Sequence, residues 1–127
     1  MLRFLSDEWL QAFDAALRSD RELGARFVGS PIAIAQEVDD GAVRYVVVLD
    51  GDGGRIETQN HEYPVDVTFA CDRGTAAELA RGTLNAQRAL TSGRLKLRGE
   101  VDRLGAAGSA LAGLGDLLAD LRADTEF

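Results

Sequence analysis

Few residues in this chain have the types and the spacing that metal binding or phosphate binding requires. The run from Asp50 to Arg55 begins like a calcium loop, because carboxylates alternate with glycine. A calcium loop also needs an oxygen ligand at its fifth position, glycine at its sixth and glutamate at its twelfth, where this chain has Gly54, Arg55 and His61. The run lacks the Gly-Lys-Ser/Thr of a phosphate-binding loop and precedes a predicted strand rather than a helix. A β-turn therefore accounts for these residues better than either site.

Groups for nucleophilic and acid–base chemistry are equally scarce. The single histidine and the single cysteine, His61 and Cys71, fall short of the four ligands of a structural zinc site. No third group is evident that would orient them as a nucleophile–base pair. Paired turn acids such as Asp39 and Asp40 do acid–base work only in a cleft that shifts their pKa values. We therefore expect no catalytic residue, no metal and no cofactor, and predict that the chain is not an enzyme in its own right. An accessory domain for an enzyme on another chain remains an alternative.

Length and composition describe one small globular domain. The chain has 127 residues, of which 46% are apolar and 28% are charged. These values are close to globular averages, and we expect residues 1–127 to form one domain. The net charge of −7 argues against non-specific nucleic-acid binding. One cysteine fits a reducing compartment, and the longest apolar run, Tyr45 to Leu49, is too short to span a membrane. Because Asp7 and Glu8 interrupt the place of an export signal, we expect a cytoplasmic protein.

Hydrophobic periodicity predicts helices and strands in the order of an α+β fold. Ser6 caps a predicted helix over residues 6–23, and Gly24 is its expected end. Thr75 and Glu78 form a capping box that opens a short helix. Alternating apolar residues separated by glycine-rich turns predict hairpin-linked strands. The predicted strands span residues 32–38, 42–50, 55–60, 63–71 and 94–101, and the further predicted helices span 75–81, 85–91 and 104–121.

The last predicted helix carries a continuous apolar seam beside a row of small residues. The seam recurs at three- and four-residue steps, and each glycine of the row costs about 1 kcal/mol of helix propensity relative to alanine. The glycines therefore allow close packing on the sheet, leave space for a ligand or loosen the helix, unless the helix begins only at Ser109. The seam consists of Leu104, Ala107, Leu111, Leu114, Leu118 and Leu121, and the row of Gly105, Gly108, Ala112 and Gly115.

Basic residues gather on one face of the predicted strand 94–101. Arg94, Lys96 and Arg98 alternate with Leu95 and Leu97, so the cations point away from the core. A solvated sheet face is the simplest interpretation. The alternative is a contact surface for a partner's acids or for anionic lipid headgroups, worth about 1 kcal/mol per base near an anionic membrane. The row lacks the interleaved aromatic residues of a nucleic-acid site.

A specific pattern lies between residues 82 and 99. It consists of Gly82, Asn85, Gln87, Ala89, Gly93, Leu95, Lys96 and Gly99. This pattern resembles the hallmark of the sterol carrier protein family, of the non-specific lipid-transfer type, and the order of predicted elements over residues 6–121 is similar to that of the family. The resemblance implies an α+β fold with a five-stranded, mainly antiparallel sheet, helices over one face, and an apolar ligand in a tunnel between them. Ala86 stands where the family has proline, and residues 99–102 replace a methionine-rich run that helps line the family's tunnel.

The resemblance and the lack of catalytic groups together predict a non-catalytic carrier. The expected ligand is an apolar small molecule, such as a fatty acid, an acyl-CoA or a sterol-like lipid, which burial of apolar surface stabilises by about 25 cal/mol per Å². The C-terminal helix, weakened by its glycines, is the expected gate. The alternative is a closed core, without a cavity above about 300 Å³, that acts as an interaction or accessory module and docks a partner protein or a second copy. Either interpretation is compatible with a homo-oligomer. The expected apolar lining is Trp9, Phe13, Val67, Phe69, Leu90, Leu95, Leu97, Leu111, Leu114 and Leu118.

Overall fold

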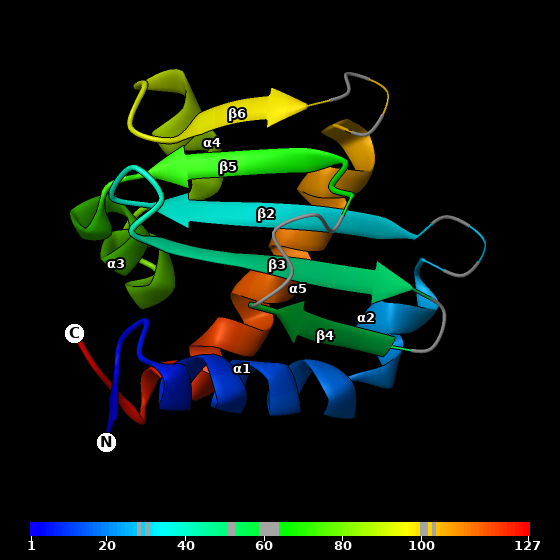
Figure 1. Cartoon of the computed structure of the whole chain (residues 1–127), viewed down its shortest axis with the longest axis horizontal. Helices are drawn as coiled ribbons and strands as arrows, with labels where there is room; N and C mark the ends of the chain where they lie inside the picture. The colour runs from blue at the N-terminus through cyan, green and yellow to red at the C-terminus, as the bar shows by residue number, and fades with distance from the viewer. Residues whose placement is uncertain (28, 30, 51–52, 59–63, 100–101, 103) are drawn as a thin grey trace.

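The centre of the fold is a five-stranded sheet with the order β4-β3-β2-β5-β6 (Figure 1). The computed structural model describes residues 1–27, 29, 31–50, 53–58, 64–99, 102 and 104–127. The strands are β1 (Leu2–Arg3), β2 (Ile32–Val38), β3 (Val43–Asp50), β4 (Gly53–Glu57), β5 (Val67–Cys71), β6 (Lys96–Gly99) and β7 (Thr125–Glu126). The helices are α1 (Asp7–Ser19), α2 (Arg21–Ala25), α3 (Arg73–Arg81), α4 (Ala86–Thr91) and α5 (Leu104–Arg122).

One of the four strand pairings in this sheet is parallel. β2 pairs with β3, β3 with β4, and β5 with β6 as antiparallel neighbours, whereas β2 and β5 run in the same direction with Ile34 beside Val67. The parallel pair arises because the chain leaves the edge strand β4 and returns on the other side of β2. The prediction of an α+β fold with a five-stranded, mainly antiparallel sheet is confirmed, with a mixed sheet as the observed form.

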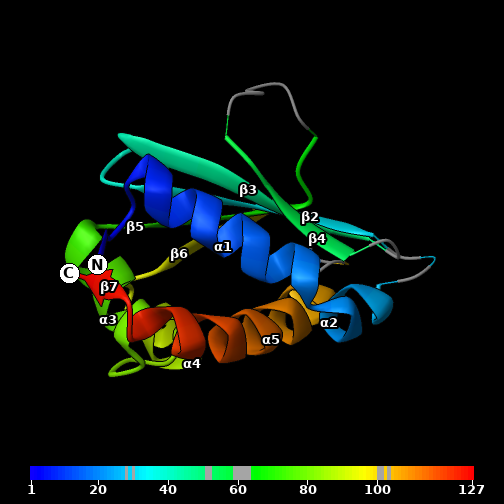
Figure 2. The same ribbon diagram turned by 90° about the horizontal axis from the view of Figure 1, so that it is seen from below.

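The described helices lie on one face of the sheet. Figure 2 shows the sheet and α5 as two layers, with α1 along one side between them and α3 and α4 at one end. The short strands β1 and β7 pair in parallel and bring the two ends of the chain together at that end. In the part of the chain that the structure describes, no helix is both long and apolar enough to cross a membrane.

Strand alternation sorts the apolar residues onto two faces. Ile32, Ile34 and Val38 of β2 face the helices and join the main core, because successive side chains of a strand point to opposite faces. Ala33 and Ala35, on the opposite face, form a small second cluster with two valines of β3. The helix-facing side of the sheet therefore positions the large apolar side chains that a cavity between sheet and helices requires.

The predicted single helix over residues 6–23 is two helices, separated at Asp20. Ser6 caps α1 as predicted, with its Oγ accepting a hydrogen bond from the backbone N–H of Trp9. The helix ends at Ser19, and Asp20 caps a second helix, α2, that includes Gly24. Gly24 lies inside α2 and does not end a helix. A Cβ at this position would overlap the backbone of Gly53 on β4, so close packing on the sheet requires glycine there.

Several other boundaries differ from the prediction. Asp72 rather than Thr75 caps α3, and its carboxylate accepts a hydrogen bond from the Thr75 N–H at 2.7 Å. β5 and β6 are shorter than predicted, and β4 begins at Gly53 and ends at Glu57. Residues 59–63, including His61, and residues 100–101 lie outside the described part of the chain. α5 begins at Leu104, so the alternative in which this helix starts only at Ser109 is wrong.

Candidate ligand cavity

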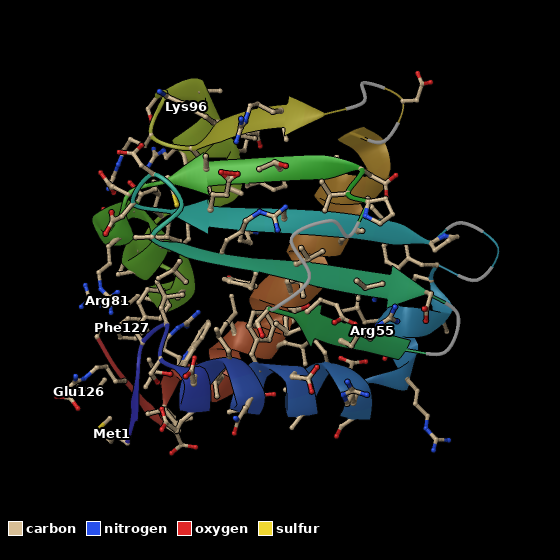
Figure 3. The ribbon with its side chains drawn as sticks, viewed as in Figure 1. Met1, Arg55, Arg81, Lys96, Glu126 and Phe127 are labelled. Carbon is tan, nitrogen blue, oxygen red and sulfur yellow. The ribbon has the colours of Figure 1, made fainter. Side chains whose placement is uncertain are left out.

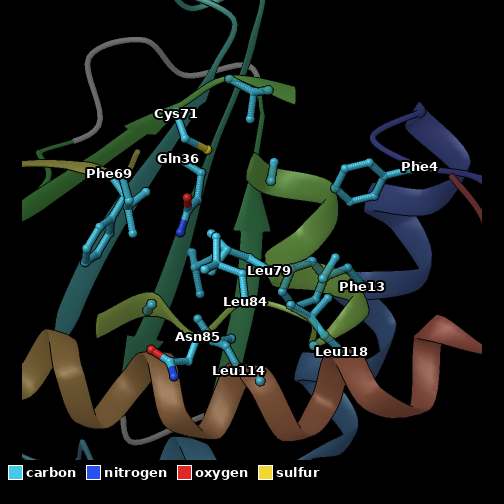
Figure 4. Close-up of a pocket in the computed structure, with 18 of the residues that line it drawn as sticks. Phe4, Phe13, Gln36, Phe69, Cys71, Leu79, Leu84, Asn85, Leu114 and Leu118 are labelled. Atoms are coloured by element: carbon cyan, nitrogen blue, oxygen red, sulfur yellow. The ribbon is translucent and has the colours of Figure 1, made fainter. Parts of the chain in front are cut away.

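A cavity of about 600 Å³ lies between the helix-facing side of the sheet and helices α3, α4 and α5 (Figure 4). β2, β3 and β5 supply one wall, and α5 supplies the opposite wall through Leu114 and Leu118. α1 contributes Trp9 and Phe13. The further apolar lining consists of Phe4, Val38, Val47, Phe69, Ala76, Leu79, Ala80, Leu84, Ala86, Leu90 and Leu95.

Seven of the residues predicted as apolar lining lie at this cavity. They are Trp9, Phe13, Phe69, Leu90, Leu95, Leu114 and Leu118. Val67 and Leu97 do not line it: Val67 is fully buried in the core, two residues before Phe69 on the same strand, and Leu97 is half-buried on the edge strand β6. The side chain of Leu111 lies outside what the structure describes. Contact of any of these residues with a ligand stays a prediction.

The residues of the family-like pattern divide into a lining group and a structural group. Gly82, Asn85 and Gln87 line the cavity. Gly82 ends α3 in the left-handed conformation with φ of 80°, and Asn85 caps α4 by accepting a hydrogen bond from Arg88 N–H at 2.7 Å. Gly93 follows α4, Lys96 is exposed on β6, and Gly99 ends that strand. A Cβ at Gly99 would overlap the backbone of Asp66, so only glycine lets β6 lie this close to its neighbour.

An aromatic cluster lines the cavity near the end of the fold where the chain termini meet. The Phe4 and Trp9 rings meet edge to face with their centroids 5.0 Å apart, and the Trp9 and Phe13 rings do so at 5.4 Å. Trp9 Nε1 donates a hydrogen bond to Thr125 Oγ1 at 3.1 Å, which ties α1 to the C-terminal strand β7. This cluster therefore depends on a contact between residues from opposite ends of the chain.

Six polar residues outside the predicted apolar lining also face the cavity or its rim. They are Gln36, Tyr45, Cys71, Asn85, Gln87 and Arg122, of which Asn85 and Gln87 belong to the family-like pattern. The sequence could have placed Gln36 at the cavity, because it alternates in phase with Ile32 and Ile34 and so faces the helices. A polar residue at a helix-facing position of a central strand indicates a special environment.

The electrostatics of the cavity favour neutral groups. Burial raises the pKa of the Tyr45 hydroxyl far above its usual range, with a smaller contribution from Cys71. Burial, followed by the carboxylates of Asp72 and Asp39, raises the pKa of the Cys71 thiol to about 11 against a smaller opposing effect of Arg94. Both groups are therefore uncharged near neutral pH.

Arg122 is the only charged side chain among the described lining residues. It is half-buried at the end of α5, and its Nε donates a hydrogen bond to the backbone carbonyl of Ala80 at 2.8 Å. Its guanidinium lies beside Gly82, where an added Cβ would approach it to about 3.0 Å. Arg122 thus joins the end of α5 to the end of α3 at the rim of the cavity.

The glycines of α5 serve different purposes. Gly108 and Gly115 line the cavity, and a Cβ built at either one would meet no atom within 4 Å. A Cβ at Gly113 would instead overlap the side chain of Leu23 on α2. Gly113 therefore permits close packing of two helices, whereas Gly108 and Gly115 leave open space.

The predicted row of basic residues is largely neutralised. Arg94 donates a hydrogen bond to the carboxylate of Glu78, which holds the pKa of Glu78 below its usual range. Arg98 forms an ion pair with Glu37 at 2.9 Å. Lys96 points away from the sheet (Figure 3) and has no ion pair with any residue in the described part of the chain. The cations face away from the core as predicted, but two of the three are already bound to acids.

The fold and the cavity together define the class of protein: an α+β domain with an apolar cavity between a mixed five-stranded sheet and its helices. The model of the SCP-2 sterol transfer family matches residues 11–107. The chain therefore belongs to this family, whose domains bind or transfer lipids. No curated protein matches the sequence significantly.

Solved structures share this fold. A conserved protein of Thermus thermophilus has a TM-score of 0.63 and 24% identity, over 94% of this chain and 90% of that one. The crystal structure of sterol carrier protein 2 has a TM-score of 0.60 and 24% identity, over 91% of this chain and 96% of that one. A stereoselective inverting sec-alkylsulfatase from Pseudomonas sp. has a TM-score of 0.61 and 20% identity over 85% of this chain. The chain spans only 16% of the length of that sulfatase, so it is similar to one part of a larger enzyme.

Proposed function

We propose that this protein binds an apolar small molecule, such as a fatty acid, an acyl-CoA or a sterol-like lipid, in the cavity between sheet and helices, and carries it without catalysing a reaction. The observation that carries the proposal is the cavity of about 600 Å³, whose lining is mostly apolar side chains. This volume falls within the range of about 300–1,000 Å³ that is typical of small-molecule sites. Membership of a lipid-binding family supports the same assignment.

Burial of the ligand is a sufficient source of affinity. Each buried methylene contributes about 0.8 kcal/mol, so twelve of them give about 10 kcal/mol before the costs of association are subtracted. The aromatic cluster and the leucines of α5 offer such an environment on both sides of the cavity. Specific hydrogen bonds are not required for micromolar binding.

The alternative, a closed core that docks a partner protein or a second copy, is not favoured. That interpretation expects no cavity above about 300 Å³, and the cavity here, at about 600 Å³, is well above that limit. The accessory role for an enzyme is compatible with carriage, because a carrier can deliver its ligand to an enzyme on another chain.

We further propose that the carrier acts in the cytoplasm and meets anionic membranes transiently through the face of Arg94, Lys96 and Arg98. Because Glu78 and Glu37 offset two of these cations, the attraction rests mainly on Lys96. One unpaired base near an anionic surface is worth about 1 kcal/mol, which suits a brief contact.

Native mass spectrometry of the purified protein, followed by solvent extraction, tests the carrier function. The expected result is a reproducible adduct of a few hundred daltons that extracts as a lipid. A bare mass that does not shift with a panel of fatty acids, acyl-CoAs and sterols would contradict the proposal and favour the closed-core alternative.

A further inference from the structure

Two polar side chains lie next to each other on the sheet side of the apolar cavity. Gln36 of β2 and Tyr45 of β3 are paired directly across the two antiparallel strands, and both line the cavity. Side chains of directly opposed residues on one sheet face have Cβ atoms about 5 Å apart. Figure 4 shows Gln36 projecting from the sheet into the cavity, toward Leu79 and Leu84.

Neither of these side chains has a protein partner among the residues that the structure describes. Tyr45 is 8% exposed, and no described residue forms a hydrogen bond with its hydroxyl or with the Gln36 amide. Three other polar groups at the cavity have protein partners: Trp9 Nε1 donates to Thr125 Oγ1, Asn85 accepts from a backbone N–H, and Arg122 donates to a backbone carbonyl. A buried polar group without a partner is costly and uncommon, so the buried Tyr45 hydroxyl requires an explanation, and the half-buried Gln36 amide lies beside it.

The chemistry of the pair selects the kind of group that can satisfy it. A tyrosine hydroxyl both donates and accepts hydrogen bonds, and a glutamine amide does the same through its nitrogen and its oxygen. A hydroxyl or carbonyl oxygen of a ligand is complementary to both. A carboxylate is less complementary to this pair, because neither side chain carries a positive charge, and Arg122, the cation among the described lining residues, lies at the end of α5 rather than on the sheet. Burying an anion without a cation beside it is strongly unfavourable.

We propose that Gln36 and Tyr45 bind an uncharged oxygen of the ligand, a hydroxyl or a carbonyl, inside the cavity. The inference rests on the proposed carrier function and narrows it to lipids that carry such an oxygen on an otherwise apolar body. The two residues act as a specificity element, while the surrounding apolar side chains supply most of the affinity.

A displacement assay with four ten-carbon compounds tests the proposal. Nile red is the fluorescent probe, its own affinity is measured for each variant, and the competitors are decan-1-ol, decan-2-one, 1-chlorodecane and decanoate. The variants are Tyr45→Phe, which removes only the hydroxyl, and Gln36→Met, which keeps the length of the side chain without its amide. Gln11→Met, an exposed glutamine of α1 outside this cavity, is the matched control.

We expect the wild-type protein to prefer decan-1-ol or decan-2-one over 1-chlorodecane, and each cavity variant to lower that preference about tenfold, the usual size of one buried hydrogen bond. A larger loss for the alcohol than for the ketone identifies a hydroxyl as the preferred group, and the reverse identifies a carbonyl. Affinity for 1-chlorodecane should be unchanged, and Gln11→Met should retain the wild-type preference.

The Tm of the ligand-free variants distinguishes ligand binding from a structural role of the Tyr45 hydroxyl. Because the Tyr45 hydroxyl has no partner among the described residues, Tyr45→Phe should keep or raise the Tm. A lowered Tm would show that the hydroxyl has a partner within the protein and would overturn the proposal. Wild-type preference in both cavity variants would also overturn it, as would decanoate binding that is tighter than alcohol binding and depends on Tyr45. If none of the four compounds displaces the probe from the wild-type protein, the carrier function itself fails.

Discussion

Gly115 offers a way to fill the cavity without disturbing the core. It lines the cavity from α5, and a Cβ built there would meet no atom within 4 Å. Gly115→Leu should therefore place a leucine side chain in space that a ligand needs, while it replaces one of the poorest helix formers. We expect the same substitution to raise the stability of the fold and to weaken ligand binding.

The structure sets the size of both effects. Leucine exceeds glycine in helix propensity by about 0.8 kcal/mol, which raises the Tm of a domain of this size by about 3 °C. If the new side chain displaces about three methylenes of the ligand, the loss is about 2.4 kcal/mol. The dissociation constant then rises by about 50-fold.

Intrinsic fluorescence is a direct assay for the binding effect. Trp9 is the single tryptophan of the chain, lines the cavity and is 2% exposed, so titration with decan-1-ol should change its emission. Gly113→Ala is the matched control on the same helix. Its Cβ would meet the side chain of Leu23 on α2 rather than enter the cavity, so it should leave the dissociation constant unchanged. Wild-type affinity in Gly115→Leu would refute the placement of the ligand against α5.

Three further predictions follow from local contacts. Ser6→Ala removes the acceptor for the Trp9 N–H and should destabilise the protein by about 1 kcal/mol, seen as a Tm about 4 °C lower; an unchanged Tm would show that water replaces the cap. Because burial raises the pKa of Cys71 to about 11, its alkylation by iodoacetamide should accelerate steadily between about pH 8 and pH 10, where a free thiol with a pKa near 8.5 levels off. A plateau within that interval would contradict a buried thiol. Lys96→Glu should slow lipid transfer to anionic vesicles about fivefold without changing equilibrium binding, and equal transfer rates would exclude this face from membrane contact.

The pattern of apolar residues predicted the five strands of the central sheet and the longer helices, but not all of their ends, and it missed β1, α2 and β7. Alternation in residues 32–38 and the three- and four-residue steps after residue 104 identified β2 and α5 with nearly correct bounds. The break at Asp20 and the cap at Asp72 were missed. Both are carboxylates that accept a hydrogen bond from a backbone N–H three residues later, and nearby residues also satisfied the helix-start and helix-end signals. Local rules allowed more than one boundary, and tertiary packing selected one.

The strand pattern did not predict which residues of β5 reach the cavity. Val67 and Phe69 share one face of β5, and an alternating pattern treats them alike, yet only Phe69 reaches the cavity. Position along the strand decides this, since the cavity lies toward the end of β5 that α3 follows. The sequence shows that Gln36 is a polar residue at an otherwise apolar, helix-facing position of its strand. It does not show that Tyr45 lies beside Gln36, because the cross-strand partner of a residue depends on register.

The sequence by itself determined the order of the strands in the central sheet and of the longer helices, the cap at Ser6 and the family-like pattern between Gly82 and Gly99, because those depend on conformational preferences within a few residues. Only the tertiary structure decided the parallel pairing of β2 with β5, the neutralisation of Arg98 by Glu37 and the meeting of Gln36 with Tyr45 inside the cavity. These contacts join strands whose register is set by the packing of the whole sheet against its helices. Local preference cannot specify that register, because the free energy that selects it comes from burying side chains that are distant in the chain.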